Sequence, residues 1–288
     1  MTPLSWTALV GENTFLWHGP NRGLMLTVWW NVVLFALSVP AYLLDKRTIL
    51  GINPWIKPIK FEVSVILFCL TVAALLSALG RMGRWEHWRL AIAWGIGIAM
   101  IFENTIIALQ SARGVRSHMN FTTLFNGVAF GIMGLFILLT TILLGILLIL
   151  FLITETGLPR PVTVGICLGL AIALAGSVEG SLMVTHYKAH TVGAPDGGPG
   201  LPFVNWSTQH GDLRVAHFLA LHALQFFPLA GWLFARTSLT GWAQVAGTVA
   251  FACVYATVAT LLFMQAIRGR PLLGDATRTT ALLARQGP

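Results

Sequence analysis

Seven stretches of this sequence are each long and apolar enough to cross a lipid bilayer, and this feature limits the fold more than any other. A transmembrane helix needs roughly 20 mostly apolar residues, and only helices or closed barrels satisfy their backbone polar groups inside lipid. The seven stretches cover residues 23–44, 61–79, 90–110, 124–153, 162–184, 216–235 and 241–267. We therefore expect an all-α integral membrane protein, a multi-pass seven-helix bundle.

The composition agrees with this class and argues against others. Charged residues make up only 10% of the chain and hydrophobic residues 56%, whereas a soluble protein carries about a quarter charged residues. The net charge of +8 comes from Lys and Arg residues that flank the apolar stretches, which favours the lipid bilayer over nucleic acid as the partner. The three cysteines lie inside apolar stretches, so a disulfide framework is not expected.

The charge of the connecting segments predicts the orientation. Twelve of the 18 Lys and Arg residues lie on the side of the C-terminal tail, and six on the side of the N-terminus. Because basic loops stay in the cytoplasm, we expect the N-terminus outside and the tail, residues 268–288, in the cytoplasm, in the plasma (inner) membrane of a bacterium. Residues 1–22 mix apolar and polar side chains, which predicts a segment on the membrane surface. The seven-helix domain then covers residues 23–267 and includes a polar loop at 185–215.

Polar residues concentrate between residues 179 and 225, where five of the eight histidines lie around a centre rich in Gly and Pro. Ionisable residues inside membrane spans are costly, and each is a functional hypothesis. In this chain they are Glu62, Glu103, Glu179, His217 and His222. All five lie in the half of the bundle nearest the predicted cytoplasmic loops. We therefore expect one polar cavity, open to that face and covered by those loops.

The predicted roles follow from residue chemistry. Carboxylates among imidazoles suit acid–base catalysis, and the expected catalytic residues are Glu103, Glu179, His217 and His222. A substrate with an anionic or polar group would be bound by Gln110, Arg113, Asn120, Asp212 and Arg214. Metal ligation is expected of His118, His186 and His190, which leaves a divalent metal or a haem open as the cofactor.

Some of the polar residues also have a structural alternative. Asp212 and Arg214 would pair with each other and cap the sixth helix. Glu62 would pair with Lys57 or Lys60 in the headgroup layer. These interpretations predict local partners and leave no group free for a substrate.

Spacing predicts which side chains share a helix face. If the fifth helix continues past the membrane, Glu179, His186 and His190 form one stripe. His222 and Gln225 are three residues apart and would face the same wall. Small residues four apart let helices approach closely; such pairs are Gly127 with Gly131, Gly165 with Gly169, and Gly176 with Gly180.

Named membrane chemistries fit poorly. A retinal protein needs a lysine within a helix, and the only lysine after Lys60 is Lys188, at a predicted helix end. Membrane desaturases need several histidine boxes, and only His186 and His190 have that spacing here. Ceramidase-like zinc hydrolases use residue types that this chain also has, but their HxxxH spacing in the last helix is missing; the types are supplied by Ser117, His118, Asp212, His217 and His222.

The expected function is that of a membrane-embedded enzyme acting on a lipophilic or membrane-proximal substrate. A proton-coupled transporter would use the same Glu and His residues as a relay, and would need a polar path across the whole membrane. A non-catalytic membrane assembly factor would use the polar loop as a docking surface. The absence of charged residues from the other half of the bundle argues mildly against the transporter.

Overall fold

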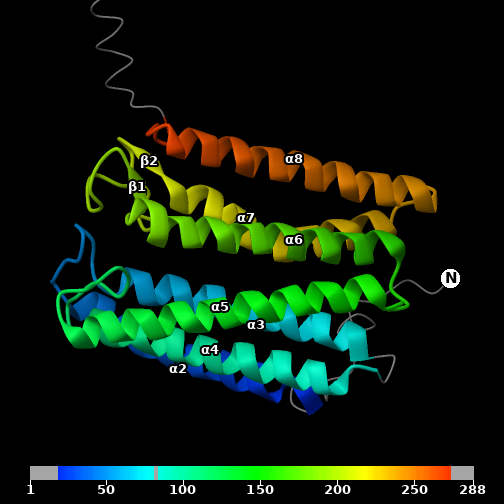
Figure 1. Ribbon diagram of the computed structural model, residues 1–288, viewed down its shortest axis with the longest axis horizontal. Helices are drawn as coiled ribbons and strands as arrows, with labels where there is room; N and C mark the ends of the chain where they lie inside the picture. The colour runs from blue at the N-terminus through cyan, green and yellow to red at the C-terminus, as the bar shows by residue number, and fades with distance from the viewer. Residues whose placement is uncertain (1–18, 81–83, 274–288) are drawn as a thin grey trace, which may run out of the picture.

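The structure, a computed structural model, describes residues 19–80 and 84–273. It confirms an all-α fold with seven helices that are long and apolar enough to cross a membrane (Figure 1). The elements in order are η1 Gly19–Asn21, α2 Arg22–Leu44, α3 Ile56–Gly80, α4 Glu86–Ala112, α5 Leu124–Ile153, α6 Arg160–Leu182, the π-helical turn η2 Met183–Tyr187, β1 Thr191–Val192, β2 Gly211–Asp212, α7 Leu213–Ala235 and α8 Gly241–Ile267. Residues 1–18 of the predicted surface segment and residues 274–288 of the C-terminal tail lie outside the described residues.

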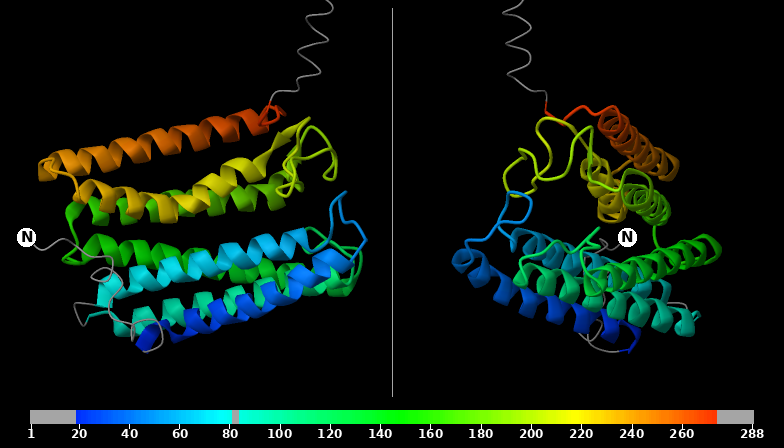
Figure 2. Two further views of the ribbon diagram at one scale, coloured as in Figure 1. Left: turned by 180° about the vertical axis from the view of Figure 1, so that it is seen from behind. Right: turned by 60° about the vertical axis from the view of Figure 1, so that its left-hand side comes forward.

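The helices form two groups that lie side by side (Figures 1 and 2). One group contains α2 to α5 and the other contains α6 to α8. A single cluster of buried apolar side chains joins them and includes Leu76 of α3, Leu147 of α5 and Ile166 of α6. Leu147 and Ile166 lie in the halves of their helices nearest the α5–α6 turn. This apolar contact therefore holds the groups together at the end far from the β1–β2 hairpin.

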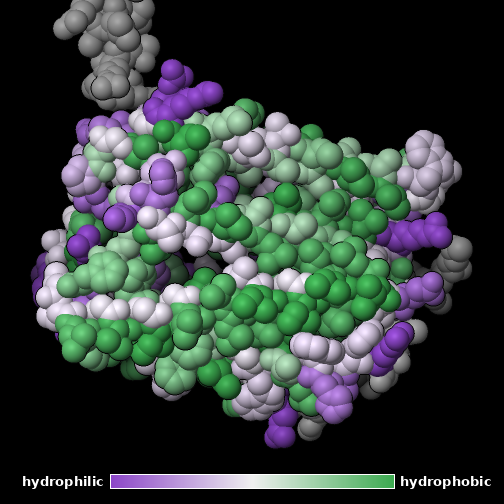
Figure 3. Space-filling view, viewed as in Figure 1, coloured by the Kyte–Doolittle hydropathy of each residue, from purple (hydrophilic) through white to green (hydrophobic). Residues whose placement is uncertain are grey.

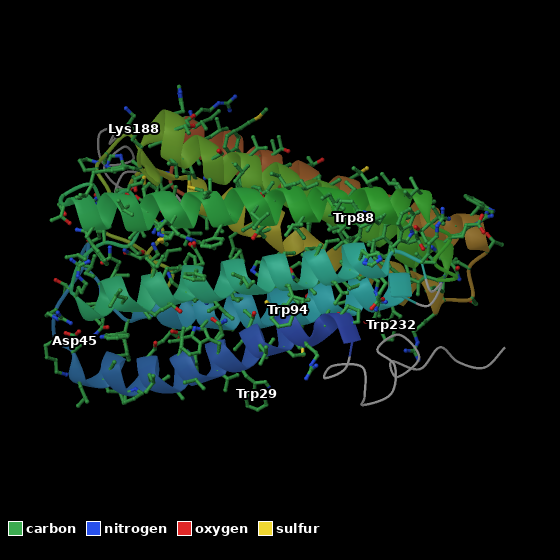
Figure 4. All side chains as sticks on the ribbon, turned by 60° about the horizontal axis from the view of Figure 1, so that its bottom comes forward. Trp29, Asp45, Trp88, Trp94, Lys188 and Trp232 are labelled. Carbon is green, nitrogen blue, oxygen red and sulfur yellow. The ribbon has the colours of Figure 1, made fainter. Side chains whose placement is uncertain are left out.

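The surface agrees with a membrane setting. Figure 3 shows an apolar band between two ends that carry hydrophilic residues. Large apolar side chains such as Leu135, Leu138 and Val254 are exposed on the helices, and lipid is the environment that favours this. Asp45 and Lys188 lie at one end of the bundle, whereas Trp232 lies toward the other (Figure 4).

Glycines allow α6 and α7 to pack closely. A Cβ atom at Gly165 would collide with the Phe227 carbonyl oxygen, and one at Gly169 would lie 2.8 Å from the Ala223 carbonyl oxygen. The small-residue face predicted for this helix is therefore confirmed. The similar prediction for α5 is wrong, because a Cβ at Gly131 would meet nothing within 4 Å.

Several helices extend beyond their apolar stretches. Helix α3 begins at Ile56, so Lys57 and Lys60 are helical, because the apolar stretch marks only the part of a helix that lipid surrounds.

Helix α6 instead changes to a π-helical turn at Met183 and stops where Lys188 has a left-handed φ of 52°. The predicted stripe of Glu179, His186 and His190 is therefore wrong, because both features break the α-helical spacing.

Candidate functional site

The end of the bundle with the β1–β2 hairpin carries the candidate site. The α6–α7 loop, which we define as residues 188–212, lies over the start of α3, where Lys60 Nζ donates a hydrogen bond to the Val204 carbonyl oxygen at 3.2 Å. The same loop touches the α2–α3 connection, since a Cβ at Gly197 would lie 3.2 Å from Leu50 Cδ2. The loop therefore bridges the two helix groups at this end.

A row of titratable side chains lies on the α2–α5 side. Lys57 Nζ is 3.1 Å from His118 Nδ1, and His118 Nε2 is 3.6 Å from Glu103 Oε1. A charged lysine can only donate, so Nδ1 of His118 accepts and its Nε2 carries the proton that faces Glu103. Glu103 is only 2% exposed, and its Oε2 has no hydrogen-bond partner among the described residues. The row can pass a proton between the lysine and the buried carboxyl.

The environment keeps His118 neutral. Burial lowers the pKa of His118 well below its usual 6.5, and the positive charges of Lys57 and of His190 when it is protonated lower it further. Aromatic rings surround the imidazole, with the Phe61 and Phe130 ring centroids at 6.1 and 5.8 Å. A neutral imidazole in an apolar setting can relay a proton without holding a charge of its own.

A second imidazole–carboxylate pair lies in the α6–α7 loop. Asp196 accepts hydrogen bonds from His190 Nδ1 at 2.7 Å, from the His190 backbone N–H at 3.0 Å and from the Thr191 N–H at 2.9 Å. Burial alone would raise the pKa of Asp196, but these hydrogen bonds outweigh it and hold that pKa below its usual value. Burial lowers the pKa of His190 despite the opposing effect of Asp196. The ionised Asp196 thus fixes the proton on Nδ1 and leaves Nε2 of His190 as a free base.

The two pairs and the lysines of α3 form one cluster, which we define as Lys57, Lys60, Glu103, His118, His190 and Asp196. The charges of Lys57 and Arg214 act on His190, and the charge of His190 acts in turn on His118 and His217. The cluster is assembled from both helix groups, because its members come from α3, α4, the α4–α5 connection and the α6–α7 loop. Convergent polar groups of this kind are typical of binding and catalytic sites.

Asp212 and Arg214 have the structural role predicted as their alternative. Asp212 is the N-cap of α7, where Oδ1 accepts from the Arg214 backbone N–H at 3.0 Å. Its two oxygens also accept from Arg214 Nε and Nη2 at 2.9 and 2.6 Å, and from the Ser207 N–H at 2.7 Å. Asp212 is therefore saturated, whereas Arg214 remains 28% exposed and borders the cluster.

The other predicted substrate-binding residues hold the α4–α5 connection together. Asn126 Oδ1 accepts from Gln110 Nε2 at 3.1 Å and from Arg113 Nη1 at 2.8 Å. Asn120 Nδ2 donates to the Arg116 carbonyl oxygen at 2.8 Å. These partners account for the polar character of Gln110, Arg113 and Asn120 without a ligand.

The histidines of α7 also find structural partners. His217 Nδ1 donates to the Gly176 carbonyl oxygen on α6 at 2.7 Å, and so ties the two helices together. The Nδ1 of His222 lies 3.2 Å from Gln225 Oε1, and Gln225 Nε2 donates to Thr71 Oγ1 of α3 at 3.3 Å. The predicted shared face of His222 and Gln225 is confirmed, at a distance from the row that contains Glu103.

Two other glutamates, Glu62 and Glu179, form no ion pair or hydrogen bond with the cluster among the described residues. Glu179 is half-buried in the last turn of α6, and its Oε2 has no hydrogen-bond partner among those residues. Glu62 accepts a hydrogen bond from Ser38 Oγ on α2 at 2.7 Å and forms no ion pair with a lysine among the described residues. Glu103 lies beside His118, and His222 lies beside Gln225; the shared cavity of Glu103, Glu179 and His222 stays a prediction.

The predicted metal ligands are only partly brought together. His118 and His190 belong to the cluster, whereas His186 is exposed and packs edge-on against Tyr187 at a centroid distance of 4.8 Å. Within residues 19–80 and 84–273, no group of three or more His, Cys, Asp or Glu residues has a geometry that could hold a metal ion.

The chain matches no protein-family model, no curated protein and no solved structure. The site therefore rests on its own geometry. Sequence reasoning missed two of its members, Lys57 and Asp196. The apolar stretch begins after Lys57, which predicts a loop there, and the glycines and prolines around Asp196 predict only a tight turn. A histidine and an aspartate six residues apart in a polar loop, as with His190 and Asp196, were the available signal.

Proposed function

We propose that this protein is a membrane-embedded enzyme that catalyses general acid–base chemistry on a membrane-proximal substrate. The observation that carries the proposal is the pair of imidazole–carboxylate couples, Asp196 with His190 and Glu103 with His118, which face one cluster from opposite helix groups. The hydrogen bonds of the two imidazoles to Asp196 and Lys57 support a role as free base for His190 and as proton relay for His118.

His190 acts as the general base. Its Nε2 takes a proton from the substrate or from water, and Asp196 stabilises the imidazolium that forms. On the other side of the cluster, Lys57, His118 and Glu103 return a proton to the leaving group. His190 carries its proton on Nδ1 and His118 carries its proton on Nε2. This difference in tautomer makes His190 the base and places His118 on the acid side.

The distribution of charge favours an enzyme over a proton-coupled transporter. In the half of the bundle beyond Glu103, acidic, basic and histidine residues occur, within the described helices, only in the first turns of α2, α4 and α6. A proton path across the membrane would need titratable groups or water in that half. We place the site at the cytoplasmic face of a bacterial plasma membrane, because the basic connections gather there.

The test is lipid turnover by the purified protein. The protein is reconstituted into nanodiscs with a complex polar lipid extract, and lipid species are followed by mass spectrometry. Wild-type protein should convert at least one species, and His190→Gln should slow that conversion by about 10²- to 10⁴-fold, the usual contribution of a general base. His87→Gln, the same change in the first turn of α4 at the opposite end, should leave the rate unchanged. Equal rates for His190→Gln and wild type would refute His190 as the base, and no conversion by wild type would refute a lipid as the substrate.

A further inference from the structure

Two lysines of the cluster lack ionic partners. Lys57 and Lys60 are partly buried, yet neither forms an ion pair with a carboxylate among the described residues. Their hydrogen bonds go to the imidazole of His118 and to the Val204 carbonyl oxygen. A buried or partly buried charge normally has a counterion, so these two ammonium groups point to a missing anion.

The nearby carboxylates are already committed. Asp196 accepts three hydrogen bonds from the His190 side chain and from backbone N–H groups of its own loop. Asp212 accepts from Arg214 and from the Ser207 backbone. The charges of Glu103 and Asp196 act on Lys57, and that of Asp212 acts on Lys60. None of these three carboxylates forms an ion pair with either lysine among the described residues, so a direct counterion is still missing.

A third cation lies within electrostatic range of both lysines. The charge of Arg214 acts on Lys57 and on Lys60. Its Nε and Nη2 atoms bond to Asp212 and to the Asn205 carbonyl oxygen, whereas Nη1 has no hydrogen-bond partner in the part of the chain that the structure describes. Lys60 and Arg214 bond to the carbonyl oxygens of the adjacent residues Val204 and Asn205, so these two cations meet at one point of the loop, with Lys57 in electrostatic range.

A pocket opens beside Arg214. It has a volume of about 200 Å³ and lies within the α6–α7 loop. None of the described residues that line it is acidic, and its polar lining consists of Thr191, Asn205, Ser207, Gln209, His210 and Arg214. The volume is below the ≈ 300–1,000 Å³ of sites for drug-sized ligands, so it suits a small polar group rather than a whole lipid.

We propose that the point where these cations meet binds a phosphate group of the substrate, held by Lys57, Lys60 and Arg214, with the adjoining polar part of the molecule in the loop pocket. This inference rests on the proposed function and names its substrate class, a phosphorylated compound. Phosphate is favoured over carboxylate because its additional oxygens and charge can satisfy two ammonium groups and a guanidinium together. Bound there, the phosphate lies beside His190, the general base.

The experiment is equilibrium dialysis of labelled inorganic phosphate against the full-length protein in zwitterionic nanodiscs. Wild type should bind phosphate, and Lys60→Gln should weaken binding by about tenfold or more, because a charge-assisted hydrogen bond is lost. Lys46→Gln removes the same charge at the same end of the bundle, but Lys46 is exposed and bonds only to the Leu43 carbonyl oxygen among the described residues. This control should bind as wild type does. Equal binding by wild type and Lys60→Gln would overturn the inference.

A second arm identifies the source of the phosphate. Nanodiscs with and without phosphatidic acid are compared, and competition by that lipid against inorganic phosphate indicates a lipid headgroup. Phosphate binding without such competition indicates a soluble phosphorylated compound; both results support the phosphate site. His190→Gln separates this inference from the proposed function, since it should retain phosphate binding while it loses turnover. Turnover by a wild-type protein that binds no phosphate would overturn the inference alone.

Discussion

The neutral state of His118 makes a quantitative prediction about stability. Its pKa lies well below 6.5 in the folded protein because burial and neighbouring cations disfavour the imidazolium, while the unfolded chain keeps a value near 6.5. Below pH 6.5 the unfolded state therefore binds a proton that the folded state does not. The contribution of neutral His118 to the free energy of unfolding is fully present above about pH 6.5, and it is lost as the pH falls toward the pKa of His118 in the folded state.

The size of the effect follows from this difference. Between pH 6.5 and 5.5, with the folded pKa below that window, linkage gives a loss of about 1 kcal/mol in the free energy of unfolding from this one histidine. Lys57, Glu103, Ser117 and His190 face the imidazole. Lys57, Glu103 and His190 also contribute to the pH dependence of stability. The contribution of His118 is therefore isolated by comparing the pH dependence of wild type with that of a variant that lacks only this imidazole.

The comparison is between wild type and His118→Gln. Unfolding by SDS in mixed micelles, followed by tryptophan fluorescence, gives the free energy of unfolding at both pH values. The wild-type value should fall by about 1 kcal/mol more than that of His118→Gln over the unit of pH. The amide oxygen of the introduced glutamine can still accept from Lys57, so the local packing is largely kept. Equal pH dependence in the two proteins would show that the pKa of His118 is the same in the folded and unfolded states, and the relay argument would fail.

Three further predictions concern the fold and the loop. Asp196→Asn removes the charge that raises the pKa of His190, so that pKa should fall further, and the turnover assay should show a slower rate and an acidic limb displaced to lower pH. Gly165→Ala should destabilise the protein by about 1–3 kcal/mol, because its Cβ collides with the Phe227 carbonyl oxygen, whereas Gly131→Ala, in open space, should stabilise it by up to about 1 kcal/mol in the same SDS titration. Ser38→Ala removes the hydrogen bond to Glu62 Oε1 and should lower the free energy of unfolding by about 1–3 kcal/mol. The control is Ser64→Ala, on an exposed position of α3. An equal loss in both variants would contradict the burial of Glu62.

Hydropathy sufficed to predict the seven helices because lipid imposes a length and an apolar composition on every span. It could not predict the ends, where Lys57 and Lys60 continue α3 outside the apolar stretch. It also could not predict helix rotation. Glu62 and Glu103 are both buried acids, and only the packing of α3 and α4 decides that one meets Ser38 and the other His118.

The loop was the hardest part to predict, because its contacts depend on side chains far apart in sequence. Gly and Pro indicated turns but not where the chain leads. The approach of Gly197 to Leu50 and the bond from Lys60 to Val204 bring the loop over α3. The pairing of His190 with Asp196 was readable in principle, since both lie in one short polar segment.

The position of the site between two helix groups has a mechanistic consequence. The apolar core joins the groups at the α5–α6 end, through residues such as Leu147 and Ile166. At the other end the α6–α7 loop makes the connection through polar contacts, which are individually weaker. A small relative movement of the groups would therefore separate the base, His190, from the relay that ends at Glu103, while the core stays intact. Substrate that binds Lys60 and Arg214 together would oppose this movement, so binding itself would bring the base and the relay into register.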